Sequence, residues 1–185
     1  EILVLTGMLW LASRTFAGGL AGFGLRRHRL SRDLLWAVVG YLMLFPFCMV
    51  LVETTVWLLV NLRPTLQLPE HDIAVLLRQG QLSWVIQCLL WLMTCLLVPA
   101  FEEVFFRGLF QSWIRSATGM VWLPIILSGV MFALVHQPYW QFVPALAALG
   151  IALGYAYERT GSLRLVIIFH CIFNLRTLLL LGLVS

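Results

Sequence analysis

The sequence predicts an all-α fold, a polytopic bundle of transmembrane helices. Of its 185 residues, 62% are hydrophobic and 11% are charged, whereas an ordinary soluble domain is about 45–50% apolar and about 25% charged. The mean hydropathy is +0.97. Long apolar runs alternate with short polar segments, as expected of helices that cross a bilayer. Because so few charges could not cover this much apolar surface, the composition excludes a soluble globule.

The first part of the chain predicts one complete span. Residues 1–12 are apolar but would form a helix only about 18 Å long, too short for a bilayer core of about 30 Å. We expect them to be the end of a truncated first span. Residues 13–33 are rich in glycine and arginine and predict a basic loop. Residues 34–52 carry no charge, and we expect this helix to continue to residue 62.

The rest of the chain divides in the same way. Prolines and charged residues over 63–82 predict a polar connection. The helices that we expect after it cover residues 83–115, about 121–136, about 140–157 and 163–184, with turns at 116–120 and 158–162. We therefore divide the chain into a first part, 1–82, and a second part of core helices, 83–185.

The arginines predict the orientation in the membrane. The chain has twelve basic residues, all of them arginine, and a formal net charge of +4. Alternating spans place eight of them on the side of the 116–120 turn: Arg14, Arg26, Arg27, Arg29, Arg32, Arg115, Arg159 and Arg164. Because basic residues concentrate in cytoplasmic loops, this side is predicted to be cytoplasmic, in the plasma membrane of a bacterium. No interleaved basic and aromatic stripe indicates a nucleic-acid partner.

A few ionisable residues lie where the bilayer should exclude them, at a cost of about 2.5 kcal/mol or more each. Glu103 and Arg107 are four residues apart, so they can pair on a helix. Glu102 points about 100° away from that pair. The apolar residues around it would desolvate its carboxylate and make it a stronger general base. The alternative is a charged helix end at the membrane interface.

Two histidines and an asparagine can join Glu102. His170 and Asn174 are four residues apart and share one face of the last helix. A rise of 1.5 Å per residue brings Glu102 and His136 to similar heights, with His170 and Asn174 nearby. We expect a polar pocket between helices, below the cytoplasmic surface. The alternative interpretation is that both histidines are hydrogen-bonded core residues.

The ordered set of motifs resembles the CPBP family, which contains the type II CAAX prenyl endopeptidases and the bacterial Abi or bacteriocin-immunity proteins. The motifs are E-E-x-x-x-R from Glu102 to Arg107, F-x-x-x-H from Phe132 to His136, and H-x-x-x-N from His170 to Asn174. The resemblance covers roughly residues 83–176, and the ordered set is more specific than any one motif.

The resemblance implies an intramembrane glutamic endopeptidase without a cofactor. Glu102 and His136 would activate a water molecule, and His170 and Asn174 would donate hydrogen bonds to the oxyanion. Glu103 and Arg107 would be the supporting ion pair. The implied partners are the lipid bilayer and a membrane-associated peptide or protein substrate.

Other chemistries remain open. Glu102, His136 and His170 could supply the three ligands of a zinc protease, although the chain has no H-E-x-x-H. Ser128 lacks the Gly-x-Ser-Gly setting of a serine intramembrane protease, and the two aspartates fall near loop boundaries. A non-enzymatic immunity or scaffold protein, in which the polar cluster only fixes helix packing, is the alternative from another class. Glu53 could pair with Arg176, reach an interface or line a substrate path.

Overall fold

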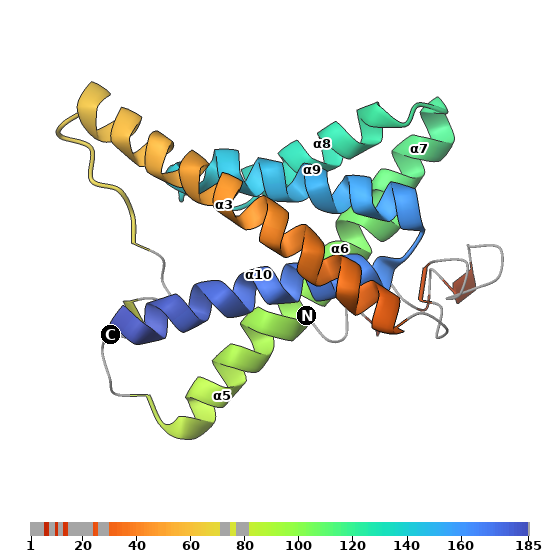
Figure 1. Cartoon of the computed structure of the whole chain (residues 1–185), viewed down its shortest axis with the longest axis horizontal. Coiled ribbons are helices and arrows are strands. Elements are labelled where there is room, and N and C mark those ends of the chain that lie inside the picture. The colour runs from red at the N-terminus through yellow and green to blue at the C-terminus, as the bar shows by residue number, and fades with distance from the viewer. Residues whose placement is uncertain are drawn as a thin grey trace.

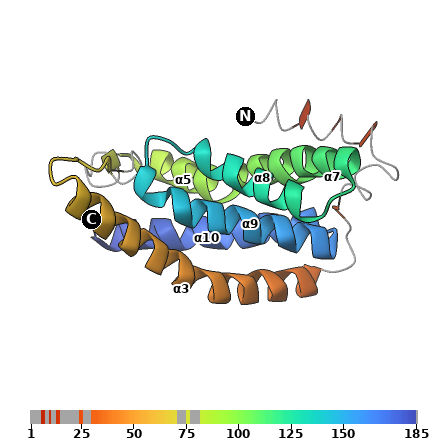
Figure 2. The same cartoon turned by 90° about the horizontal axis from the view of Figure 1, so that it is seen from above.

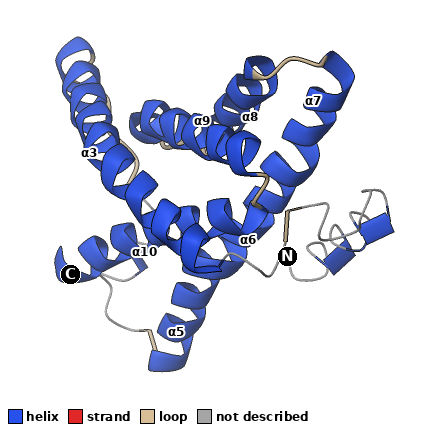
Figure 3. Ribbon diagram, turned by 45° about the vertical axis from the view of Figure 1, so that its right-hand side comes forward, coloured by secondary structure: helices blue, strands red, loops and turns tan. Residues whose placement is uncertain are grey.

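The computed structural model describes residues 6–7, 10, 13–14, 24–25, 30–70, 75–76 and 82–184, with side chains up to residue 180. Every regular element within these ranges is helical (Figure 3). Four helices are long and apolar enough to cross a membrane, and Trp122–Leu134 is a shorter apolar helix. The predicted all-α polytopic bundle is confirmed. Most of the predicted span at 1–12 and most of the basic loop at 13–33 lie outside the described residues.

Helix α3 (Leu30–Leu62) begins earlier than the predicted boundary, so part of the expected loop is helical. The reason is a contact far along the chain. Asp33, in the first turn of α3, is buried; its Oδ2 accepts a hydrogen bond from Arg164 Nε at 2.8 Å and one from Ser162 Oγ at 3.1 Å. This ion pair ties the start of α3 to the start of α10 (Leu163–Val184).

The predicted helix over 83–115 is one helical run, Trp84–Thr118, in which two stretches are wound as π-helix. In order its parts are α5 (Trp84–Leu92), η2 (Met93–Leu97), α6 (Val98–Glu103), η3 (Val104–Gln111) and α7 (Ser112–Thr118). Helix α5 has no buried residue and extends away from the other helices (Figure 1). The π stretches flank α6, which carries Glu102 and Glu103, and such widened turns occur frequently at functional sites.

Three boundaries in the second half differ from the predictions. Helix α8 (Trp122–Leu134) ends two residues before the predicted boundary, so His136 lies in a turn. Pro138 follows this turn, and a residue that precedes a proline disfavours the helical conformation. Helix α9 begins at Val143 after a short 3₁₀ turn, η4 (Trp140–Phe142), and continues to Thr160. It ends at Gly161, whose φ of 60° is left-handed, so the expected turn 158–162 shrinks to two residues.

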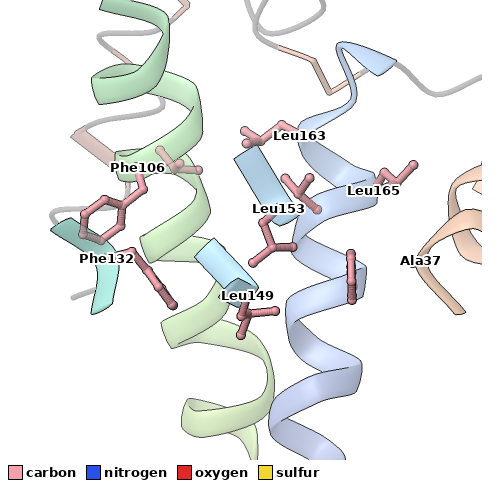
Figure 4. Packing of buried hydrophobic residues seen from close by; sticks show 10 residues of the cluster. Ala37, Phe106, Phe132, Leu149, Leu153, Leu163 and Leu165 are labelled. Carbon is pink, nitrogen blue, oxygen red and sulfur yellow. The ribbon is translucent and has the colours of Figure 1, made fainter. Parts of the chain in front are cut away.

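Helix α9 lies between α8 on one side and α3 and α10 on the other (Figure 2). Glycine allows its closest approach to α8: a Cβ on Gly150 would lie 2.7 Å from Gly129 Cα. Because lipid is as apolar as the side chains, the hydrophobic effect does not hold membrane helices together. Small residues let two helices come close enough for van der Waals attraction to do so. Apolar residues from these helices and η3 fill the core beside this contact (Figure 4): Ala37, Phe106, Phe132, Leu149, Leu153, Leu163 and Leu165.

Three polar contacts show that the helical run containing η3 and α7 is parallel to α9. Arg107 Nη2 donates to Gly150 O and Gln111 Nε2 donates to Gly154 O, each at 2.9 Å. Arg115 Nε donates to Glu158 Oε1 at 2.9 Å. Because both residue numbers rise together, the helices share a direction, and α7 and α9 end at the same end of the bundle. These contacts hold η3 and α7 against α9, and α6, which directly precedes η3, carries part of the polar cluster described next.

Candidate active site

The Glu102 carboxylate lies between two imidazole rings. Its Oε1 is 3.6 Å from His136 Nε2, and its Oε2 is 3.7 Å from His170 Nε2. The three residues come from α6, the turn after α8, and α10. The side chain of His170 is 3% exposed, whereas those of Glu102 and His136 are 16% and 29% exposed. The structure therefore brings together three of the four residues expected to act in catalysis, with His170 buried and His136 partly exposed.

His136 is oriented by the end of its own helix. Its Nδ1 lies 2.7 Å from Phe132 O, and a carbonyl oxygen only accepts hydrogen bonds. Nδ1 therefore carries a proton, and Nε2 faces Glu102. The early end of α8 at Leu134 gives His136 the freedom to fold back onto this carbonyl. The Phe132 ring packs against His136, with ring centroids 4.8 Å apart.

Glu103 and Arg107 form the ion pair expected from their spacing. Arg107 Nη1 lies 2.8 Å from Glu103 Oε1, and both side chains are 0% exposed. The guanidinium also lies 4.9 Å from the centre of the Phe132 ring. A buried charge without a partner is strongly destabilising, so each of these groups needs the other. The carbonyl of Gly150, available where α8 and α9 meet at glycines, accepts a further Arg107 N–H.

The sequence did not predict that Glu103 also contacts His170. His170 Nδ1 lies 2.9 Å from Glu103 Oε1, so one carboxylate oxygen serves both Arg107 and His170. The motif spacing pairs Glu103 with Arg107 within one helix, but no local signal connects it to a residue on α10. The contact exists because α10 packs against α6.

Asn174 lies one turn beyond His170 on α10 and is held by the backbone of η2. Its Nδ2 donates to Thr94 O at 3.0 Å. In η2 the N–H of Val98 bonds to Met93 O, five residues back; the corresponding partner of Thr94 O would be residue 99, which is a proline and has no N–H. Pro99 is thus the sequence signal for a carbonyl that is free to bind a side chain.

The other polar residues at membrane depth lie elsewhere. Ser128 is buried and donates to Phe106 O at 3.3 Å, so it fixes α8 against η3. Arg176, one possible partner of Glu53, lies 4.1 Å from the centre of the Phe45 ring. Glu53 is exposed on α3, and Asp72 is outside the described residues.

The described His, Cys, Asp and Glu side chains include no group of three arranged to hold a metal ion. What the Glu102 cluster offers is a carboxylate and two imidazole nitrogens around one point, with an asparagine amide on the adjacent turn of α10. Such groups can accept a proton from a small molecule and donate hydrogen bonds to a developing negative charge.

Comparison with protein families matches residues 84–176, about half of the chain, to the family described as type II CAAX prenyl endopeptidase Rce1-like. The match covers all three motifs. Neither the curated proteins nor the solved structures contain a match to the chain. The chain therefore belongs to the Rce1-like family of type II CAAX prenyl endopeptidases, a family of membrane proteases.

Proposed function

We propose that this protein hydrolyses a peptide bond within or next to the membrane, using a water molecule activated by Glu102 and His136. The reaction needs no covalent intermediate and no cofactor. The observation that carries the proposal is the position of the Glu102 carboxylate, 3.6 Å from His136 Nε2 and 3.7 Å from His170 Nε2. Atoms at these separations can both bond to one water oxygen placed off the line between them, at about 2.8 Å from each.

The chemistry follows from these donors and acceptors. Glu102 takes a proton from the water while the water oxygen forms a bond to the scissile carbonyl carbon. The carbonyl electron pair moves onto its oxygen, giving a tetrahedral oxyanion. When this collapses, the C–N bond breaks and Glu102 returns the proton to the leaving amine. A positioned general base of this kind contributes about 10²–10⁴-fold in rate.

His170 and Asn174 are the proposed donors to the oxyanion. They lie one turn apart on α10, and Asn174 uses one amide N–H on Thr94 O, so its second N–H is available to the substrate. A donor aimed at developing charge in a water-poor site is worth about 10²–10³ in kcat. The buried position of His170 supports this role, because a donor shielded from water interacts more strongly with a developing charge.

The proposed substrate is a membrane-associated peptide or protein, presented from the cytoplasmic side of a bacterial plasma membrane. Arg115 pairs with Glu158, and Arg164 pairs with Asp33, so these arginines lie at one end of the bundle, where Arg159 also lies. This asymmetry supports the cytoplasmic assignment. The family's name supports a prenylated C-terminal peptide as the first substrate to test.

The test is hydrolysis of a farnesylated C-terminal peptide, and of the same peptide without the lipid, by the purified chain in liposomes. We expect cleavage by the wild type and a loss of about 10²–10⁴-fold in kcat in Glu102→Gln and in His136→Ala, with unchanged helicity. Glu53→Gln, an exposed carboxylate on α3, is the matched control and should cleave normally. If the wild type cleaves no peptide and a cell-based function survives both site substitutions, the immunity or scaffold alternative is correct.

A further inference from the structure

The Phe132 ring on α8 packs against both imidazoles of the candidate site. Its centroid lies 4.8 Å from that of His136 and 5.5 Å from that of His170. Arg107 Cζ lies 4.9 Å from the centre of the same ring, and the centroid of the Phe106 ring lies 5.4 Å from it. Phe132 is fully buried. One buried ring therefore contacts both histidines and the cation of the buried ion pair.

Each imidazole is fixed by a hydrogen bond at its Nδ1 atom. His136 Nδ1 lies 2.7 Å from Phe132 O, and His170 Nδ1 lies 2.9 Å from Glu103 Oε1. The torsion that turns a histidine ring has a broad energy minimum, so a bond at one nitrogen leaves the ring able to swing. A second restraint is needed to keep each Nε2 directed at Glu102.

The Phe132 ring supplies this second restraint to both histidines. Its plane is inclined by 54° to the His136 ring and by 78° to the His170 ring. Aromatic rings favour such inclined and edge-to-face arrangements over a face-to-face stack. Rotation of either imidazole would press it against a ring that close packing holds in place.

The buried ion pair holds the Phe132 ring in turn. Arg107 lies within the distance of about 6 Å at which a cation is attracted to the face of an aromatic ring. Arg107 is itself fixed by Glu103 Oε1, at 2.8 Å from its Nη1. The ion pair contacts His170 directly through Glu103, and the Phe132 ring connects it to His136.

We propose that Phe132 is a positioning residue, whose ring keeps Nε2 of His136 and Nε2 of His170 directed at the Glu102 carboxylate. The inference rests on the proposed function, because this orientation affects the rate only if Glu102 and His136 activate a water molecule. A misplacement of about 1 Å can cost about 10²-fold in rate. Loss of the ring therefore lowers kcat and leaves KM nearly unchanged.

The kinetic test compares two buried phenylalanines. We expect Phe132→Leu to lower kcat by about 10–100-fold. Phe106→Leu is the matched control, because Phe106 is also buried and contacts Phe132 and Arg107. Each substitution removes one core ring and leaves a cavity, so we expect similar falls in the thermal midpoint, with kcat near the wild-type value in Phe106→Leu. A wild-type kcat in Phe132→Leu, or an equal loss in both variants, would overturn the proposal.

A second variant covers the case in which leucine destabilises the fold too far. Phe132→Met fills the same space with a flexible chain in place of a flat ring. It should lower kcat as Phe132→Leu does. A wild-type kcat in a folded Phe132→Met protein would show that only the volume of the ring matters, which also overturns the proposal.

NMR of the full chain in detergent, with labelled histidine and phenylalanine, tests the orientation without an assay of activity. The chain has four histidines, and the signals of His136 and His170 are those lost in His136→Gln and His170→Gln. We expect cross-peaks between the Phe132 ring protons and both of these histidine rings in the wild type. The absence of either cross-peak contradicts the inference, and that result needs no variant to fold.

The same spectra show whether the rings are held in one orientation. We expect the signals of His136 and His170 to be single in the wild type and in Phe106→Leu, and to broaden or split in Phe132→Leu. Single, unshifted signals in Phe132→Leu would mean that other contacts orient the imidazoles. If the wild type cleaves no peptide, the proposed function fails, but the spectra still decide whether Phe132 orients the two rings. The two failures are therefore distinguishable.

Discussion

Asn174 on α10 donates its side-chain amide to the main-chain oxygen of Thr94 on η2, at 3.0 Å. That oxygen is available because the residue five positions later is Pro99, which has no N–H. A proline inside a helix usually costs stability, about 3 kcal/mol relative to alanine. Here it frees a carbonyl that orients a proposed oxyanion donor.

Pro99→Ala should therefore separate stability from activity. The new N–H competes with Asn174 for Thr94 O, so we expect kcat to fall about 10-fold or more, while the thermal midpoint is equal to or above that of the wild type. Peptide hydrolysis and a thermal unfolding scan measure the two quantities. Pro124→Ala is the control, because Pro124 lies in the first turn of α8, where an N–H has no helical partner. A wild-type kcat in Pro99→Ala would show that this carbonyl does not orient Asn174.

The contact between α8 and α9 should tolerate no added methyl group. In Gly150→Ala the new Cβ meets the Gly129 backbone at 2.7 Å, whereas in Gly154→Ala it meets the flexible end of Gln111 at 2.8 Å. We expect a loss of about 1–3 kcal/mol for Gly150→Ala and a smaller loss for Gly154→Ala. Unfolding in denaturant measures both. Equal losses would contradict the close backbone contact.

Chelation distinguishes the general-base mechanism from the zinc alternative. Because the proposed reaction uses only side chains, we expect 1,10-phenanthroline to leave the hydrolysis rate of the purified protein unchanged, and added Zn²⁺ not to raise it. Loss of activity on chelation, restored specifically by Zn²⁺, would assign Glu102, His136 and His170 to a metal instead.

Labelling of single cysteines tests the orientation. In a chain whose four natural cysteines are replaced by serine, Ala117→Cys and Thr160→Cys should react with an impermeant maleimide only from the cytoplasmic side, and Thr65→Cys only from the other. All three positions are exposed. If Ala117→Cys and Thr160→Cys react from opposite sides, the parallel packing of α7 and α9 is wrong. If they react together from the outer side, only the assignment of the cytoplasmic face is wrong.

The sequence by itself determined the membrane environment, the long apolar helices of the part that the structure describes and the identity of the conspicuous polar residues. These follow from composition, apolar run length and spacing within a helix, which are local properties. The pairing of Glu103 with Arg107 is of this kind, since four residues make one turn. Boundaries were less accurate: Asp33 belongs to α3 because Arg164, far along the chain, pairs with it.

Only the tertiary structure decided which groups face one another. The contact of Glu103 with His170 joins positions 67 residues apart, and that of Asn174 with Thr94 joins positions 80 apart. Neither leaves a periodic trace in the sequence, because each depends on the rotation of one helix relative to another. That rotation depends on how α10 packs against α6 and η2, and on the π stretches around α6, whose wider turns redirect the side chains that follow.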